Sequence, residues 1–466
     1  MRARAVSGAA IHQPPRPDAS TLSVGVLVLG SCVLTASRTA AMAWVVAAAI
    51  AVLVVRERHG LPRRQLAVSL ATGAIGVALL PLADHAWLHA AEGLRIGSTF
   101  LALMASVSFL AAAARRSPPI RRTAEELLGR GPQLGGLPVV AVAHLFPALL
   151  NIAGTAILCE MASTAARPAH PPAQLDQAVF SAIHRGFVAA VCWSPMFGNM
   201  ALLLALYPTL DWPDVAPLGL VAGGLCSLMT LAVGPLRRVS GGWTGAGREL
   251  TTLVRLMVPL VLGMVVFLAA SLAVHKAFAV PTALAITVLA PLFALLWNRW
   301  DVGSVGGAAA RMLGDARAAF PRMAPEALFF ACAGFMAVMV GAVLPQDLIT
   351  AAARPLHGHA ALALSLLLGA NIAMALIGVH PVVTALLLAT ALPPDTLGLA
   401  PLPHFMAVLV GWGVAFSISP FTLTSAMIAR YTGHSPFVVA YRWNALFAAA
   451  MLAVVLPLLW MLAVMS

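Results

Sequence analysis

Residues 361–392 read ALALSLLLGANIAMALIGVHPVVTALLLATAL and contain no Asp, Glu, Lys or Arg. Near the middle, Gly378-Val-His-Pro381 interrupts the apolar run with two residue types that break helices. A bilayer core takes about 20 apolar residues in one helix, so this run is too long for one comfortable span and too short for two. The stretch therefore predicts a re-entrant hairpin, which enters the membrane, turns back and leaves on the same side.

The composition predicts a membrane protein around this hairpin. Of 466 residues, 61% are hydrophobic and 9% charged, and the mean hydropathy is +0.93. Soluble domains are about 45–50% apolar and about 25% charged. Apolar runs alternate with short loops, which is typical of a polytopic all-α membrane protein. We place the runs at about 21–36, 40–55, 66–83, 97–113, 137–163, 187–207, 216–234, 256–274, 281–298, 326–344, 361–392, 403–429 and 443–465.

The positive charges indicate which runs cross the membrane. There are 28 Arg and Lys residues, and nearly all lie between apolar runs, a placement that sets topology and argues against nucleic-acid binding. If every run crosses once, the two sides hold 16 and 12 positive residues. If 137–163 and 361–392 are hairpins, the sides hold 24 and 4. The positive-inside rule favours two hairpins, about 11 transmembrane helices and a cytoplasmic N-terminus in a bacterial-type inner membrane.

The hairpins divide the chain into two units of opposite orientation. Gly186-Phe-Val-Ala-Ala-Val-Cys-Trp-Ser194-Pro195 is echoed by Gly411-Trp-Gly-Val-Ala-Phe-Ser-Ile-Ser419-Pro420, with the same Gly-to-Pro spacing after each hairpin. Such inverted repeats with interrupted helices are typical of secondary transporters. We therefore predict a disordered cytoplasmic tail (1–20), peripheral helices (21–65), a first repeat (66–234), a linking segment (235–280) and a second, inverted repeat (281–466).

The breaks also predict a binding site. A half-helix that begins after a break presents free N–H groups and the positive end of its dipole, so converging breaks favour an anion. Small hydrogen-bonding side chains surround them, and these can bind carboxylate oxygens or complete the shell of an alkali ion. The candidate substrate ligands are Asn151, Thr155, Ser194, Asn199, His380, Thr384, Ser419, Thr422 and Thr424, and the candidates for ion coupling are Asn151, Ser417, Ser425 and His380.

Two of these interpretations stay open. Ser-Pro pairs also occur as simple kinks, in which the serine bonds back to the preceding turn of its own helix. His380 could donate to an anion or carry a coupling proton, but it could equally cap the half-helix that follows it.

The order helix, helix, re-entrant hairpin, broken helix, helix, repeated upside down, resembles the ion-transporter superfamily, and in particular its divalent-anion/sodium symporter branch. The resemblance covers roughly residues 66–465 in topology and short patches in sequence, namely Asn151…Thr155, Ser194-Pro195…Asn199, His380-Pro381…Thr384 and Ser419-Pro420…Thr424. None of these patches is the intact Ser-Asn-Thr of that branch. The resemblance implies uptake of dicarboxylates or citrate, a homodimer and an elevator mechanism, in which the part bearing the hairpins slides against a fixed scaffold.

These observations predict a secondary active transporter of a small di- or tricarboxylate-like anion, driven by H⁺ or Na⁺. No catalytic residue, resident metal or other cofactor is assigned, and the expected partners are the solute, the lipid bilayer and a second copy of the chain in a homodimer. A cation/proton antiporter of the same fold is the first alternative, although it usually needs a carboxylate at the midplane. A membrane-embedded enzyme acting on lipid-linked substrates is the second, and it would need a cluster of acid/base or metal-binding groups.

Overall fold

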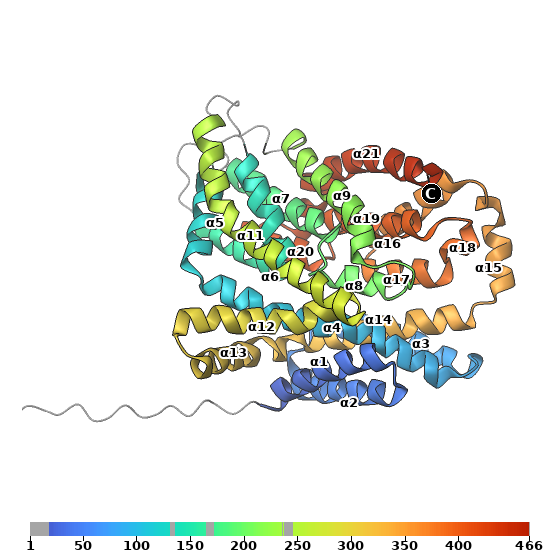
Figure 1. Ribbon diagram of the computed structural model, residues 1–466. Helices are drawn as coiled ribbons and strands as arrows, with labels where there is room; N and C mark the ends of the chain where they lie inside the picture. Colours follow the sequence, from blue (N-terminus) through green and yellow to red (C-terminus); the bar gives the residue numbers. More distant parts are fainter. Residues whose placement is uncertain (1–17, 131–135, 165–171, 235, 237–245, 466) are drawn as a thin grey trace, which may run out of the picture.

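The computed structural model describes residues 18–130, 136–164, 172–234, 236 and 246–465 (Figure 1). Every regular element in these ranges is helical. The expected tail falls mostly on residues 1–17, outside the described part, and the first helix already begins at Ala19. Eleven helices in the described ranges are long and apolar enough to cross a membrane. The prediction of an all-α polytopic membrane protein is confirmed.

The helices form two layers (Figure 1). The first, which we call the α4–α14 layer, contains long helices that lie roughly side by side. Its members are α1 (Ala19–Ser37), α2 (Ala40–Glu57), α3 (Arg63–Leu79), α4 (Ala86–Arg116), α12 (Thr282–Val302), α13 (Val305–Ala319) and α14 (Ala324–Val343).

The second, which we call the hairpin layer, contains the interrupted elements. Its members are α6 (Leu137–Thr164), α7 (Pro172–Val191), α8 (Gly198–Leu204), α9 (Trp212–Ala232), α16 (Ala360–Leu376), α17 (Pro381–Ala391), α19 (Pro401–Ile418), α20 (Leu423–Thr432) and α21 (Trp443–Met465). Helix α11 (Ala246–Phe278) connects the two repeats. Short helices α5 (Pro118–Arg130) and α15 (Gln346–Ala353) precede the hairpins, and α18 (Pro394–Leu397) follows the second.

Glycines hold α4 and α14 together at the centre of their layer. A Cβ on Gly334 would lie 2.4 Å from the carbonyl oxygen of Gly93, and one on Gly97 would lie 2.4 Å from that of Phe330. Gly93 and Gly97 are the small-xxx-small spacing that lets membrane helices approach to backbone contact. This crossing joins the second helix of each predicted repeat.

The first hairpin folds back at Asn151, whose φ of 56° and ψ of −143° are not helical. A Cβ on Gly154 would lie 2.3 Å from the carbonyl oxygen of Phe146, although a straight helix would separate these residues by about 12 Å along its axis. Each arm is about 20 Å long, too short to cross a 30 Å hydrocarbon core. Length and apolar character alone include Leu137–Ser163 among the eleven spans, but its geometry is that of a re-entrant hairpin.

The second hairpin is formed by α16 and α17, which contact each other across the break at 377–380. Its two ends emerge together, because α15 before it contacts α18 after it, and a Cβ on Gly398 would lie 2.8 Å from the ring of His357. Helix α17 is 11 residues long and cannot span the bilayer alone. Both hairpins thus belong to the confirmed fold class.

Matching contacts relate the two halves of the chain. Ser194 donates to the carbonyl oxygen of Ala148, 46 residues before it, and Ser419 donates to that of Ala375, 44 residues before it. Each serine hydroxyl also accepts the backbone N–H two residues later, at 3.2 Å and 3.3 Å. Equivalent serines thus form hydrogen bonds with equivalent hairpin arms, as expected of repeats. The predicted domain boundaries stay a prediction.

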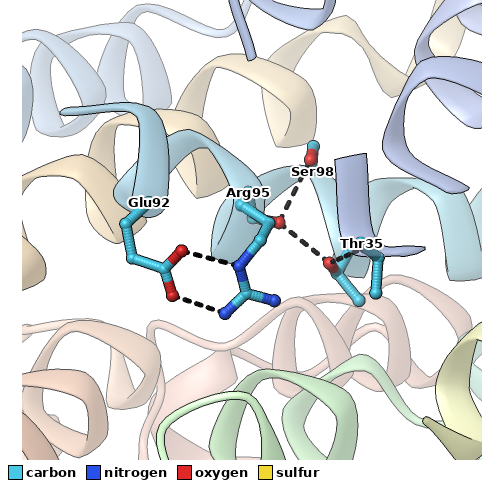
Figure 2. A network of polar contacts seen from close by, with 5 residues as sticks. Thr35, Glu92, Arg95 and Ser98 are labelled. Carbon is cyan, nitrogen blue, oxygen red and sulfur yellow. Dashed lines mark hydrogen bonds and ion pairs between the residues drawn. The ribbon is translucent and has the colours of Figure 1, made fainter. Parts of the chain in front are cut away.

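Helix α4 begins eleven residues earlier than the predicted run at 97–113, and so contains a charge pair whose arginine, Arg95, is buried and whose acid, Glu92, is partly exposed. Figure 2 shows the Glu92 carboxylate facing the Arg95 guanidinium, with Arg95 Nε 2.7 Å from a Glu92 oxygen. Ser98 and Thr99 donate to the Arg95 carbonyl oxygen, and Thr99 lies 3.4 Å from Thr35 of α1 (Figure 2). The predicted runs leave Arg95 in a loop, because a charge ends an apolar run; the structure places it inside α4, where Glu92, three residues before it, offsets its charge.

The glycine crossing predicts a specific sensitivity. We expect Gly334→Val to lower the stability of the protein by about 1–3 kcal/mol or more, because the added carbons overlap the backbone of α4. Gly263→Val on α11 is the matched control, since a Cβ there meets nothing within 4 Å. Thermal unfolding followed by size-exclusion chromatography in detergent measures both, and equal melting temperatures for the two variants would contradict the crossing.

Candidate functional site

Four interruptions meet in the hairpin layer. They lie at Asn151 in α6, between α7 and α8, between α16 and α17, and between α19 and α20. Helix α20 contacts α6 and α7, while α8 contacts α17 and α19, so each repeat's interrupted helix touches elements of the other. The rings of Phe187, Phe416 and His380 form a continuous line at this junction, with centroids 5.4 Å and 6.4 Å apart. The structure therefore brings the breaks of both repeats together.

Asn151, Ser194 and Asn199 satisfy backbone groups around the first hairpin. Asn151 donates from Nδ2 to the carbonyl oxygen of Met196 at 3.2 Å, and its left-handed φ is one that asparagine tolerates better than most residues. Asn199 donates to the carbonyl oxygen of Val191, at the end of α7, at 3.2 Å. These side chains supply hydrogen bonds that the missing helical turns would otherwise have made.

His380 caps the second hairpin. Its Nδ1 accepts the backbone N–H of Val382 at 3.2 Å, and Pro381 follows as the first residue of α17. The ring packs on Phe329 of α14, with centroids 4.9 Å apart. Of the roles left open by the sequence, capping is the one that the contacts show, because Nδ1 accepts the N–H of the second residue of α17.

Hydroxyl groups fill the break between α19 and α20. Thr422 is the N-cap of α20 and accepts from the backbone N–H of Ser425, whose own hydroxyl donates to the Ser419 carbonyl oxygen at 2.8 Å. The hydroxyl of Thr424 lies 3.2 Å from that of Thr422. Ser417 instead bonds back to Val414 within its own helix, at 2.7 Å. The structure thus brings Thr422, Thr424 and Ser425 together but leaves Ser417 outside their cluster.

Thr155 and Thr384 differ from the other candidates because their hydroxyls have no hydrogen-bond partner. Both side chains are buried, and each lies on the half-helix that begins at a hairpin tip, four residues after Asn151 or His380. A buried polar group without a partner costs about 1–3 kcal/mol. The two hairpins thus carry unpartnered hydroxyls at equivalent places.

Sequence reasoning missed a buried arginine beside this junction. Arg185 donates to the carbonyl oxygens of Val233 and Trp443 and to Asn444 Oδ1, at 2.7–2.9 Å, and stacks over Phe447. The side chain of Asn444 donates onward to His184 Nδ1, and His184 Nε2 lies 3.2 Å from the carbonyl oxygen of Phe416. The predicted runs leave Arg185 in the loop between 137–163 and 187–207, whereas the structure buries it.

Within the described part of the chain the acceptors of Arg185 are all uncharged, so there its positive charge is hydrogen-bonded without being neutralised by a carboxylate. Helix α7 begins 15 residues before the predicted run at 187–207 and carries Arg185 into the protein. The available signal was the pair His184-Arg185 directly before that run, which a helical extension would have placed inside the membrane.

Among the described residues, no group of three or more His, Cys, Asp or Glu side chains could hold a metal ion. The site is therefore built from helix ends, hydroxyls, carboxamides and one nearby guanidinium. Such a set can bind the oxygens of an anion without forming a bond to it.

Comparisons with known proteins place few limits on this chain. No protein-family model matches it, and no curated protein does. One similar solved structure is described as the crystal structure of the Alcanivorax borkumensis YdaH transporter, with an unusual topology. The two chains are 17% identical, the match covers 76% of this chain and 83% of that one, and the TM-score is 0.47. A likeness this distant carries no argument on function.

The unpartnered hydroxyls of Thr155 and Thr384 lead to a prediction about the stability of the protein without a bound ligand. We expect Thr155→Val and Thr384→Val each to raise its stability by about 1 kcal/mol, because valine has nearly the same shape without a buried unsatisfied group. Thr230→Val is the control, since that hydroxyl donates to the Cys226 carbonyl oxygen at 2.7 Å. The ligand-site interpretation fails if all three substitutions lower the melting temperature in nanodiscs equally.

Proposed function

We propose that the protein is a secondary active transporter of a small organic anion, of the di- or tricarboxylate type. The transported anion binds where the four breaks meet, between the two hairpin tips. Its carboxylate oxygens accept hydrogen bonds from Thr155 and Thr384 and are attracted by the positive ends of the half-helix dipoles. The observation that carries this proposal is the pair of buried, unpartnered threonine hydroxyls at the starts of those half-helices.

The local charge supports an anion rather than a cation. Arg185 is buried in the hairpin layer, its acceptors are uncharged, and its chain of hydrogen bonds leads through Asn444 and His184 to the break after Phe416. Half-helix N-termini add further positive potential. A carboxylate entering this environment is attracted, whereas a bare cation meets an uncompensated positive charge at low dielectric.

The two layers support an elevator mechanism. The hairpin layer holds the breaks, and it meets the α4–α14 layer through contacts of α6 and α8 with α4 and of α17 with α14. These contacts include aromatic side chains packed against small residues, such as Phe100 of α4 beside Gly198 of α8. In the proposed cycle the hairpin layer slides along this surface with the bound anion, as the resemblance to the ion-transporter superfamily implies. That family membership, a homodimeric state, an inner-membrane location and a cytoplasmic N-terminus remain parts of the proposal.

A gradient of H⁺ or Na⁺ drives the cycle in this proposal. Asn151, Ser425 and His380 are the coupling candidates that lie at the junction, while Ser417 is the weakest because its hydroxyl bonds to its own helix. Ser425 and its neighbours offer several oxygens within one break. Sodium prefers oxygen ligands of this kind, whereas a proton needs a titratable group such as His380.

A cation/proton antiporter of the same fold is the alternative. It would use a membrane carboxylate to exchange a proton for a metal ion. Glu92 lies within α4, but it is paired with Arg95 and belongs to the other layer, away from the breaks. The enzyme alternative needs a catalytic cluster, and the junction of breaks offers hydroxyls and carboxamides instead.

The test is uptake into proteoliposomes. We expect radiolabelled succinate or citrate to accumulate when an inward Na⁺ or H⁺ gradient is imposed, and Thr155→Val or Thr384→Val to raise the KM about tenfold, because each loses one hydrogen bond to a charged group. Thr230→Val should transport as the unaltered protein does, since its hydroxyl is used within α9.

Two results would overturn the proposal. One is an absence of gradient-dependent flux for every di- and tricarboxylate tested, with intact protein in sealed vesicles. The other is exchange of protons for Na⁺, K⁺ or Li⁺ in a dye-quench assay without anion flux, which would favour the antiporter.

A further inference from the structure

A polar cluster joins the two layers away from the breaks. Asp211 stands at the start of α9 in the hairpin layer. His275 lies in the last turns of the connecting helix α11, and Thr282 is the first residue of α12 in the α4–α14 layer. His275 and Thr282 flank the short connection between α11 and α12, and both contact Asp211, which lies 64 and 71 residues before them in the sequence.

The Asp211 carboxylate uses both oxygens across this boundary. Oδ1 accepts from the Thr282 hydroxyl at 2.9 Å, and Oδ2 lies 3.1 Å from His275 Nδ1. The same Nδ1 lies 2.7 Å from the Val280 carbonyl oxygen, so its hydrogen is shared. Asp211 also caps α9, accepting from the Trp212 N–H at 2.7 Å. The cluster therefore ties the first turn of α9 to the start of α12.

Other contacts between the layers have a different character. Phe100 of α4 lies against Gly198 of α8, and Gly341 of α14 lies against Thr390 of α17. A Cβ on Gly341 would lie 3.3 Å from the Cβ of Thr390. Contacts of this kind are non-directional and survive a sliding motion. A hydrogen-bonded carboxylate does not, because its bonds need donors at fixed positions.

We propose that Asp211, His275 and Thr282 form a latch that holds the hairpin layer in the position seen here. The inference rests on the proposed function, in which this layer moves between two positions. The side chains of His275 and Asp211 are 21% and 29% exposed, so water can take over their hydrogen bonds when the latch opens. A partly exposed, hydrogen-bonded carboxylate shifts a two-state equilibrium by a few-fold, enough to bias the resting position without blocking movement.

The experiment measures the distance between the layers without any substrate. Spin labels are placed on His59→Cys and Ser435→Cys, which are exposed on the α4–α14 layer and the hairpin layer respectively. Cys32 and Cys332 are replaced by alanine, since the other three cysteines are buried. Double electron–electron resonance in nanodiscs then gives the populations of the two positions.

We expect Asp211→Asn to increase the population of the second distance about threefold, because the charge is lost while asparagine still caps α9. Thr282→Val should act in the same direction, since it removes one donor. Asp214→Asn is the matched control: Asp214 accepts from the Asp211 N–H within the same turn but does not reach across the boundary in the contacts described.

The outcomes separate the latch from the mechanism on which it rests. Two distances with the same populations in the unaltered protein, Asp211→Asn and Asp214→Asn overturn the latch and leave a moving hairpin layer intact. One identical distance in every variant counts against both the latch and the elevator. A shift in Asp211→Asn and Thr282→Val but not in Asp214→Asn supports the latch.

Discussion

A backbone that stops being helical inside a membrane must find hydrogen-bond partners within the protein, because lipid offers none. This constraint shapes the hairpin layer. Ser194 and Ser419 each donate to a carbonyl oxygen in the first arm of the hairpin that precedes them. Asn151 and His380 satisfy backbone groups at the hairpin tips. Many polar side chains of this layer are committed to the backbone, whereas the hydroxyls of Thr155 and Thr384, at the starts of the two half-helices, are unpartnered and are the groups proposed to bind a ligand.

The same arrangement explains why the junction suits an anion. Helices that begin inside the protein direct N–H groups toward the centre, and small side chains let two repeats bring several such ends together. Arg185 adds a full positive charge beside them, held by carbonyl oxygens, a carboxamide and an aromatic face rather than by an acid. The glycine crossing of α4 and α14 gives the other layer a rigid centre. A carrier needs both a polar site and a firm surface for it to move against.

The hairpins and the matched serines could be predicted from the sequence because they depend on local signals: charge counts, helix breakers and spacing. Arg185 and Arg95 could not be placed that way. Each lies in a helical extension of an apolar run, where a buried charge is tolerated only through partners on other segments or one turn away. The unpartnered state of Thr155 and Thr384 depends on what surrounds them in three dimensions, and no sequence pattern reports it.

The most direct test of the account is the sidedness of the hairpin ends. Single cysteines at Glu125 and Ser163 flank the first hairpin, and single cysteines at His359 and Asp395 flank the second; all four positions are exposed. In oriented membranes treated with a membrane-impermeant maleimide, the first pair should react together from one side and the second pair together from the other. Labelling of Glu125→Cys and Ser163→Cys from opposite sides would show that the first hairpin crosses the membrane, and the inverted repeat would be wrong.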